Sequence, residues 1–258
     1  MDPSAIIAIV IAFASILVAN NMEGGMINDL LGASAFLIVA GGTAGATMLA
    51  STNAEIKAAF KLLKRVVAPG HSDRKKLLED MVKVSNVARR EGMLAVENLL
   101  ADIQDDFLKR GLRMLVDGSS GEDVKRVLEP ELELEEHHGT QAGKVFETAG
   151  GFCPTVGILG AVLGLIGVMK NINAGPEKLG EGIAVAFIAT VYGVGFANLI
   201  FIPLGNRIKK IVAHDAETRT MVLMGVCGIA AGVNARQIEE MLSPFAGHHG
   251  KDEHKAAA

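Results

Sequence analysis

The sequence predicts an all-α membrane protein with four transmembrane helices in two hairpins and a helical cytoplasmic domain. Half of the 258 residues are hydrophobic, yet 21% are charged, so the two kinds must be segregated along the chain. A helix needs about 20 largely apolar residues to cross the hydrocarbon core of a bilayer. Four runs without an ionisable Asp, Glu, Lys, Arg or His approach or exceed that length, namely residues 5–22, 30–50, 149–169 and 182–204.

The basic residues set the predicted orientation of these spans. Lys and Arg number 16 in residues 51–148, 7 in residues 205–258 and only 2 between the last two apolar runs. Basic residues close to the ends of spans stay on the cytoplasmic side. Both hairpins therefore begin and end in the cytoplasm, and both termini and the long loop are expected there.

This topology divides the chain into five predicted segments. They are a transmembrane hairpin (1–50), a cytoplasmic helical domain (51–148), a second hairpin (149–204), a C-terminal cytoplasmic helix (205–245) and a disordered tail (246–258). In the long loop, Ser72 or Asp73 can cap a helix after a Pro-Gly break, and another break is expected at residues 117–121. Residues 221–233 are apolar but too short for a fifth crossing, so we expect them to pack against the cytoplasmic helices.

Small residues form a stripe on each of the last two spans. On the third span the stripe consists of Gly157, Gly160, Gly164 and Gly167. At 100° per residue these glycines fall within an arc of about 80°, which lets another helix approach closely. On the fourth span the stripe consists of Ala186, Thr190, Gly193 and Ala197. Two such faces on adjacent helices would suit a ring of subunits.

Two prolines mark the ends of the second hairpin that are predicted to be cytoplasmic. Pro154 lies near the start of the third span and Pro203 near the end of the fourth. Proline removes a backbone donor and frees a carbonyl, so it either kinks a helix or marks its end. The pair either shapes an inner vestibule or simply punctuates the two helices.

A membrane relay for protons usually contains carboxylates or histidines, and the four spans contain neither. If the chain conducts ions, a partner must supply the carboxylate, or hydroxyls and backbone must serve. Thr155 and Thr190 are the best-placed hydroxyls to line such a path. The alternative is that each hydroxyl is bonded to the backbone of its own helix.

Opposite charges follow one another in the cytoplasmic domain at Arg89, Arg90 and Glu97. Were the helix continuous past Gly92, Arg90 and Glu97 would share a face. Such a display suits transient contacts with a charged partner, or it is a solvated helix face.

Other classes of function find little support. The net charge of −4 argues against nucleic-acid binding. Cys153 and Cys227 lack the spacing of a zinc site, so neither a metal nor another cofactor is predicted. The chain has no phosphate-binding loop and no nucleophile with a paired base, so we predict that it is not an enzyme.

Taken together, these residues resemble the MotA/PomA family of flagellar stator subunits, within the MotA/TolQ/ExbB proton channel superfamily. The most specific likeness lies in residues 150–166 (GGFCPTVGILGAVLGLI), 182–193 (GIAVAFIATVYG) and 197–203 (ANLIFIP). The resemblance implies a bacterial inner-membrane protein. It implies five copies in a ring around two copies of a single-span, peptidoglycan-anchored partner of the MotB/PomB type.

The resemblance also assigns roles to particular residues. The family's rotor-contact charges, which engage the rotor protein FliG, match Arg89, Arg90 and Glu97, and its two prolines match Pro154 and Pro203. That match implies that the prolines couple ion passage to conformational change.

The coupling ion is predicted from two further positions. Sodium-type members carry threonine where this chain has Ala161 and Ala189, so two hydroxyl ligands are missing. We therefore expect H⁺ to be translocated, with Na⁺ in a PomA-type stator as the alternative. Two rival functions stay open: an energy transducer of the ExbB/TolQ type, which usually has three spans, and a scaffold that does not conduct.

Overall fold

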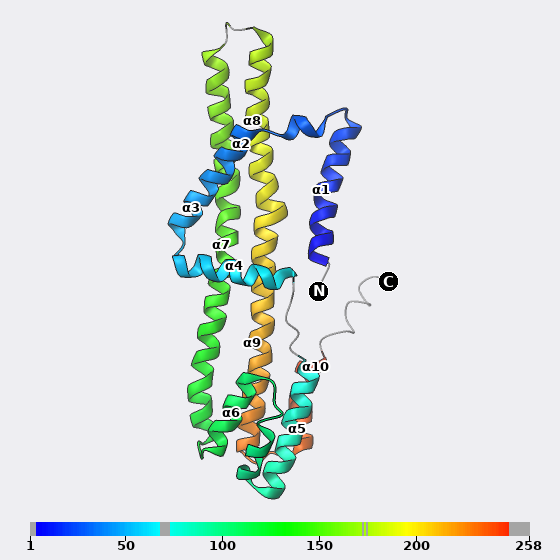
Figure 1. The fold of residues 1–258 in the computed structure, drawn as a ribbon, viewed down its shortest axis with the longest axis vertical. Helices are drawn as coiled ribbons and strands as arrows, with labels where there is room; N and C mark the ends of the chain where they lie inside the picture. The colour runs from blue at the N-terminus through cyan, green and yellow to red at the C-terminus, as the bar shows by residue number, and fades with distance from the viewer. Residues whose placement is uncertain (1–3, 68–72, 172, 174, 248–258) are drawn as a thin grey trace. The chain divides into compact units, whose positions relative to one another are not determined.

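The computed structural model describes residues 4–67, 73–171, 173 and 175–247, and in these residues it is helical without β-strands (Figure 1). The chain separates into two compact units. The first unit comprises Met1–Gly70 with His138–Ile211, and the second comprises His71–His137 with Val212–Ala258. The two long helices α7 and α9 each contribute to both units.

The first unit contains the apolar runs. Its helical segments are α1 (Ser4–Met22), η1 (Ile27–Leu30), α2 (Ala33–Phe36), η2 (Leu37–Gly41), α3 (Gly42–Ala50), α4 (Asn53–Val67), the later part of α7 (Gly121–Lys170), α8 (Pro176–Phe196), η4 (Ala197–Phe201) and the start of α9 (Ile202–Ala230). Three stretches of the described chain are long and apolar enough to cross a membrane, namely Ile27–Ala50, Gly121–Lys170 and Leu179–Ala230. The first predicted span, residues 5–22, corresponds to α1, whose apolar segment Ile7–Met22 is shorter.

Helix α4 follows the second apolar run and runs across α7 (Figure 1). The Phe60 ring of α4 meets the Phe146 ring of α7 edge to face, with 6.4 Å between centroids. Lys57, Lys61 and Lys64 give the same helix a basic character. An apolar face packed on a span beside a row of lysines is typical of a helix that lies at a membrane surface.

Two predicted boundaries are not breaks in the backbone. Helix α7 runs for 50 residues through the expected boundary at residue 149, and helix α9 continues past the expected boundary at residue 204 to Ala230. The hypothesis that Pro203 ends its helix is therefore wrong. The change from charged to apolar residues marks the expected passage from water into the membrane. A helix can continue through this boundary because its backbone hydrogen bonds are all made within the helix.

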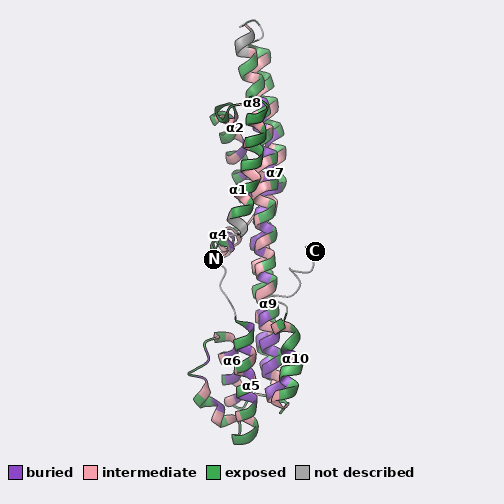
Figure 2. Cartoon of the chain, turned by 90° about the vertical axis from the view of Figure 1, so that its right-hand side faces the viewer, coloured by how far each residue is buried: buried purple, intermediate pink, exposed green. Residues whose placement is uncertain are grey.

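The second unit is an ordinary helical core. It comprises α5 (Arg74–Glu91), η3 (Met93–Leu99), α6 (Asp106–Val116), the early part of α7, the later part of α9 and α10 (Ala235–Gly247). Figure 2 shows its buried residues gathered on the helix sides that face one another. Met81, Leu108, Leu128, Met221 and Ile238 are completely buried within it.

Local expectations for this unit are largely confirmed. Asp73 caps α5, because its carboxylate accepts hydrogen bonds from the amides of Lys75 and Lys76. The break before α7 occurs at Gly118, which has a φ of 89°. The apolar stretch 221–233 packs in the core of this unit instead of standing alone as a fifth span. Of the predicted disordered tail, residues 248–258 lie outside the described residues.

Candidate functional site

The small-residue stripes of α7 and α8 pack against each other. A Cβ built on Gly157 would lie 2.9 Å from the carbonyl oxygen of Ala189, and one built on Gly160 would lie 2.9 Å from the Cβ of Ala189. A Cβ on Gly164 would lie 3.1 Å from the backbone nitrogen of Ala186. Only glycine permits this close approach of the two backbones.

Gly167 does not take part in this contact, since nothing lies within 4 Å of a Cβ built there. The other three glycines of the stripe are thus used for packing within one chain, and the expectation that such faces suit a ring of subunits stays a prediction. Larger apolar side chains, such as those of Ile158, Val162 and Phe187, are exposed on other faces of α7 and α8.

The two candidate threonines donate to their own helices. The Oγ1 of Thr155 donates to the carbonyl of Phe152 at 2.7 Å, and the Oγ1 of Thr190 donates to the carbonyl of Ala186 at 3.2 Å. Thr155 is exposed and Thr190 is half-buried. Each hydroxyl oxygen keeps its capacity to accept, so an ion or water at these positions would meet an acceptor and no free donor.

The two alanines that replace hydroxyls have different surroundings. Ala161 is half-buried on α7, whereas Ala189 is 0% exposed and lies against Gly157 and Gly160. In this chain Ala189 is thus part of the helix–helix contact and does not line an open path. A threonine there would have to fit a hydroxyl and a methyl group into a contact that is already close.

Both family-matching prolines lie inside continuous helices. Pro154 is half-buried in α7, and its Cα lies 3.3 Å from a Cβ built on Gly193. Pro203 is exposed near the start of α9, directly after the π-helical segment η4. Proline at this position removes the donor for the carbonyl four residues earlier, and a wider π turn accommodates the ring without ending the helix.

Tyr192 holds together a break in the second apolar run that was not predicted from the sequence. Leu31 and Gly32 are not helical. The Tyr192 hydroxyl donates to the carbonyl of Leu30 at 2.5 Å and accepts from the amide of Gly32 at 3.1 Å. Its ring stacks on Phe196 with 5.5 Å between centroids. The available signal was the chain's single tyrosine within an apolar run, because a buried phenol needs a partner.

The predicted rotor-contact charges gather around the end of α5. Arg89 and Arg90 are exposed in its last turn, where basic residues complement the helix dipole. Helix α5 ends at Glu91, and Gly92 has a φ of 89°. The premise of a continuous helix is therefore wrong, and Glu97 is instead an exposed residue of η3.

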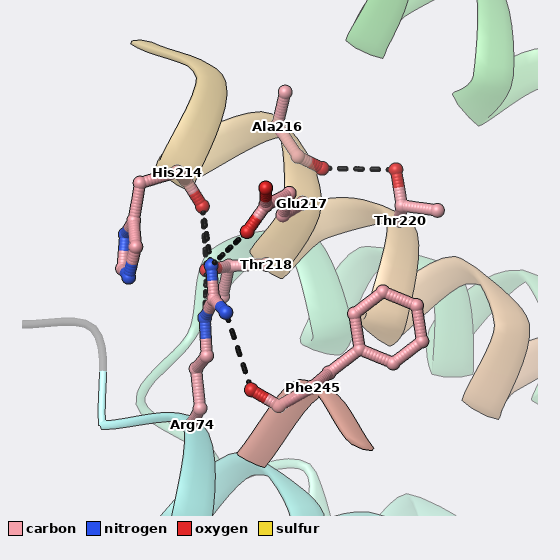
Figure 3. Close-up of polar contacts among 7 residues, drawn as sticks. All are labelled: Arg74, His214, Ala216, Glu217, Thr218, Thr220 and Phe245. Carbon is pink, nitrogen blue, oxygen red and sulfur yellow. Dashed lines mark hydrogen bonds and ion pairs between the residues drawn. The ribbon is translucent and has the colours of Figure 1, made fainter. Parts of the chain in front are cut away.

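Arg74 forms a buried polar cluster that was not expected (Figure 3). Its side chain is 7% exposed. The Nε donates to Thr218 Oγ1 at 2.8 Å, and one Nη donates to the carbonyl of Phe245 at 3.2 Å. The other Nη donates to the carbonyl of His214 at 2.8 Å and to the carboxylate of Glu217 at 3.1 Å. One guanidinium thus joins the start of α5 to α9 and to the last turn of α10.

The charged surface of the second unit is organised by ion pairs. Arg110 pairs with Glu131, and a hydrogen bond from the guanidinium lowers the pKa of that carboxyl group. At the start of α7, the Asp123 amide donates to Ser120 Oγ and the Ser120 amide donates to the Asp123 carboxylate, which together form a capping box. A further hydrogen bond from the Ser120 hydroxyl lowers the pKa of Asp123. Among the described residues, no three His, Cys, Asp or Glu side chains gather as metal ligands would.

Sequence and structure comparisons agree on one family. The profile of the MotA/TolQ/ExbB proton channel family matches residues 100–221, and that of the motility protein A N-terminal region matches residues 6–92. Motility protein A of Helicobacter pylori is 34% identical over 242 residues, which cover 94% of each chain.

Two solved structures are similar along almost the whole chain. The C. jejuni MotAB structure matches with a TM-score of 0.91 and 33% identity, covering 97% of this chain and 98% of that one. The flagellar MotAB stator complex of Bacillus subtilis matches with a TM-score of 0.86 and 30% identity, covering 99% and 100%. The chain therefore belongs to the motility protein A family, within the MotA/TolQ/ExbB proton channel family.

Proposed function

We propose that this chain is the ring-forming subunit of a flagellar stator, which with a MotB-type partner couples inward proton flow to rotation of the rotor. The observation that carries the proposal is the match over almost its full length to a chain of the C. jejuni MotAB structure. The membrane-type hairpin and the charged helical unit supply the two parts that such a machine needs, one for ions and one for the rotor.

The need for a partner follows from the chemistry of the spans. The four predicted spans contain no carboxylate and no histidine. A proton path along this chain alone would have only hydroxyls and backbone, and Thr155 and Thr190 already donate to their own helices. A single-span, peptidoglycan-anchored partner that brings a carboxylate would complete the path.

The proposed assembly is a ring of five copies around two copies of the partner, in the bacterial inner membrane with both termini in the cytoplasm. The exposed large apolar residues of α7 and α8 support burial against lipid and neighbouring chains. The basic residues that follow the second and fourth apolar runs support the orientation.

Protons are the proposed coupling ion. Sodium needs several oxygen ligands, and neither Ala161 nor Ala189 supplies one. A proton needs only a carboxylate and water, both of which the partner and the pore would provide.

Coupling to the rotor is proposed to run through the two prolines and the charged end of α5. Pro154 and Pro203 each remove one backbone hydrogen bond from a long helix, which makes bending easier at those points. Arg89, Arg90 and Glu97 are exposed and present both signs of charge to a rotor protein such as FliG.

Complementation of motility tests the proposal. A strain without stator genes would receive this chain, its single-span partner, or both, and swimming would be scored by video tracking. We expect swimming only with both proteins. Expression of both without swimming, but with recovery of outer-membrane transport in a strain lacking an ExbB/TolQ transducer, would contradict it.

A further inference from the structure

A groove of about 360 Å³ separates α1 from the segment formed by η4 and the start of α9. On the α1 side it is lined by Ala8, Ile9 and Ala12, and on the other side by residues between Asn198 and Lys210. Its size falls within the range of small-molecule sites. The small alanine side chains of α1 leave this space open where a leucine would fill it.

The lining changes from apolar to basic along the groove. Leu199, Ile200 and Leu204 line one part, together with Asn198, whose side-chain amide donates to its own helix at the carbonyl of Val194. Asn206, Arg207 and Lys210 line the other part. Residues 182–206 carry no charge, so Arg207 is the first ionisable side chain after the fourth apolar run. The groove therefore spans the level at which hydrocarbon gives way to lipid headgroups.

We propose that this groove binds an anionic phospholipid, with an acyl chain against Ala8 and Ala12 and the phosphate between Arg207 and Lys210. The charge of the groove matches a negative headgroup, and its apolar part matches a lipid tail. The groove also includes Pro203. A lipid in it would fill the space between α1 and the proline-containing turn.

The test measures retained lipid. The chain would be co-purified with its partner in mild detergent, supplied with phosphatidylglycerol or phosphatidylcholine, and analysed by native mass spectrometry. We expect phosphatidylglycerol to be retained in preference to phosphatidylcholine. Each basic residue near a membrane surface adds about fivefold in affinity for anionic lipid, so Arg207→Gln with Lys210→Gln should lower retention about 25-fold.

Two further variants separate the groove from general surface charge. Ala12→Leu keeps both cations but fills the apolar part, and it should also lower retention of phosphatidylglycerol. Lys83→Gln removes an exposed lysine of α5, which belongs to the second unit and does not line the groove, and it should leave retention unchanged.

Three results would overturn the proposal. Equal retention of both lipids would remove its headgroup specificity. Unchanged retention in both groove variants, with the complex intact by size-exclusion chromatography, would place the lipid elsewhere. Efficient disulfide cross-linking between copies from Ala12→Cys to Leu199→Cys would assign the groove to a neighbouring chain.

Discussion

Arg74 concentrates several hydrogen bonds on one buried side chain. Four acceptors from α9 and α10 surround a guanidinium that is almost fully buried. The five donors of arginine have a fixed fork geometry, whereas lysine offers a single ammonium group. The cluster therefore depends on the shape of the side chain as well as on its charge.

We predict that Arg74→Lys lowers the stability of the second unit by roughly 2 kcal/mol, because buried carbonyls and a hydroxyl lose their donor. The measurement is the thermal unfolding of the detergent-solubilised chain. Arg236→Lys is the matched control, since Arg236 is 87% exposed in its pair with Glu240 and such pairs contribute little. Equal melting temperatures for both variants would contradict the inference that the buried hydrogen bonds of Arg74 to α9 and α10 stabilise the second unit.

Cys227 provides a second prediction for a single residue. Burial raises the pKa of its thiol, and the Sγ donates to the carbonyl of Gly121 at 3.6 Å. Because the thiolate is the nucleophile, alkylation of the folded chain should rise at a higher pH than that of the unfolded chain. The measurement is the rate of maleimide labelling against pH in a Cys153→Ala background. Coincident profiles for folded and urea-unfolded protein would contradict the role of burial.

Among the elements, the second apolar run depends on a contact far away in the sequence. The hydroxyl of Tyr192 in α8 bonds both sides of the break at Leu31 and Gly32, since it donates to the carbonyl of Leu30 at the end of η1 and accepts from the amide of Gly32. Unpaired backbone groups are costly where water is absent, so this one hydroxyl stabilises a non-helical turn at the start of the second apolar run.

We predict that Tyr192→Phe loosens this turn and increases the rate of amide hydrogen exchange in residues 27–36 by roughly tenfold. This increase corresponds to the loss of about 1 kcal/mol or slightly more of stabilising free energy from the two hydrogen bonds of the phenol. The measurement is hydrogen–deuterium exchange by mass spectrometry. Thr190→Val is the control, because Thr190 donates only to its own helix, whose backbone bonds remain. The account fails if exchange rises equally in both variants or in neither.

The contact between α7 and α8 allows a comparison within one stripe. Gly160→Val should destabilise the hairpin by about 1–3 kcal/mol, because its side chain would overlap Ala189. Gly167→Val should be tolerated, since that position is open. Melting temperature and swimming speed are the two measurements. A tolerated Gly160→Val, or a Gly167→Val as harmful as Gly160→Val, would show that the stripe is used differently.

These elements also show what can be predicted from sequence and what cannot. Apolar runs and basic flanks predicted the spans because burial in lipid acts on composition over about 20 residues. The spacing of the glycines predicted a packing face but not which helix packs on it. Gly167 was therefore assigned to that face, although it makes no contact with α8. The break at Gly32 depends on a contact with Tyr192, 160 residues away, that no local pattern encodes. Pro203 marked a local disturbance of its helix, but not whether the helix would end or widen into a π turn.

For the whole molecule, the proposed motor combines an apolar hairpin that lacks its own carboxylate with a charged helical unit. Neither feature alone predicts rotation. For proton passage the hairpin needs a carboxylate from a partner, and to produce movement the exposed charges near Gly92 need a rotor protein to contact. The family match supports both requirements at once, which is why the proposal concerns a complex and not an isolated chain.

The most direct test is the swimming speed of a strain whose only stator is this chain with its single-span partner. Sodium would be varied at fixed pH, and the proton gradient would then be collapsed with an uncoupler. We predict a speed that is independent of sodium and falls to zero with the proton gradient. A speed that follows sodium and survives the uncoupler would contradict the proton-driven account and the inference from Ala161 and Ala189.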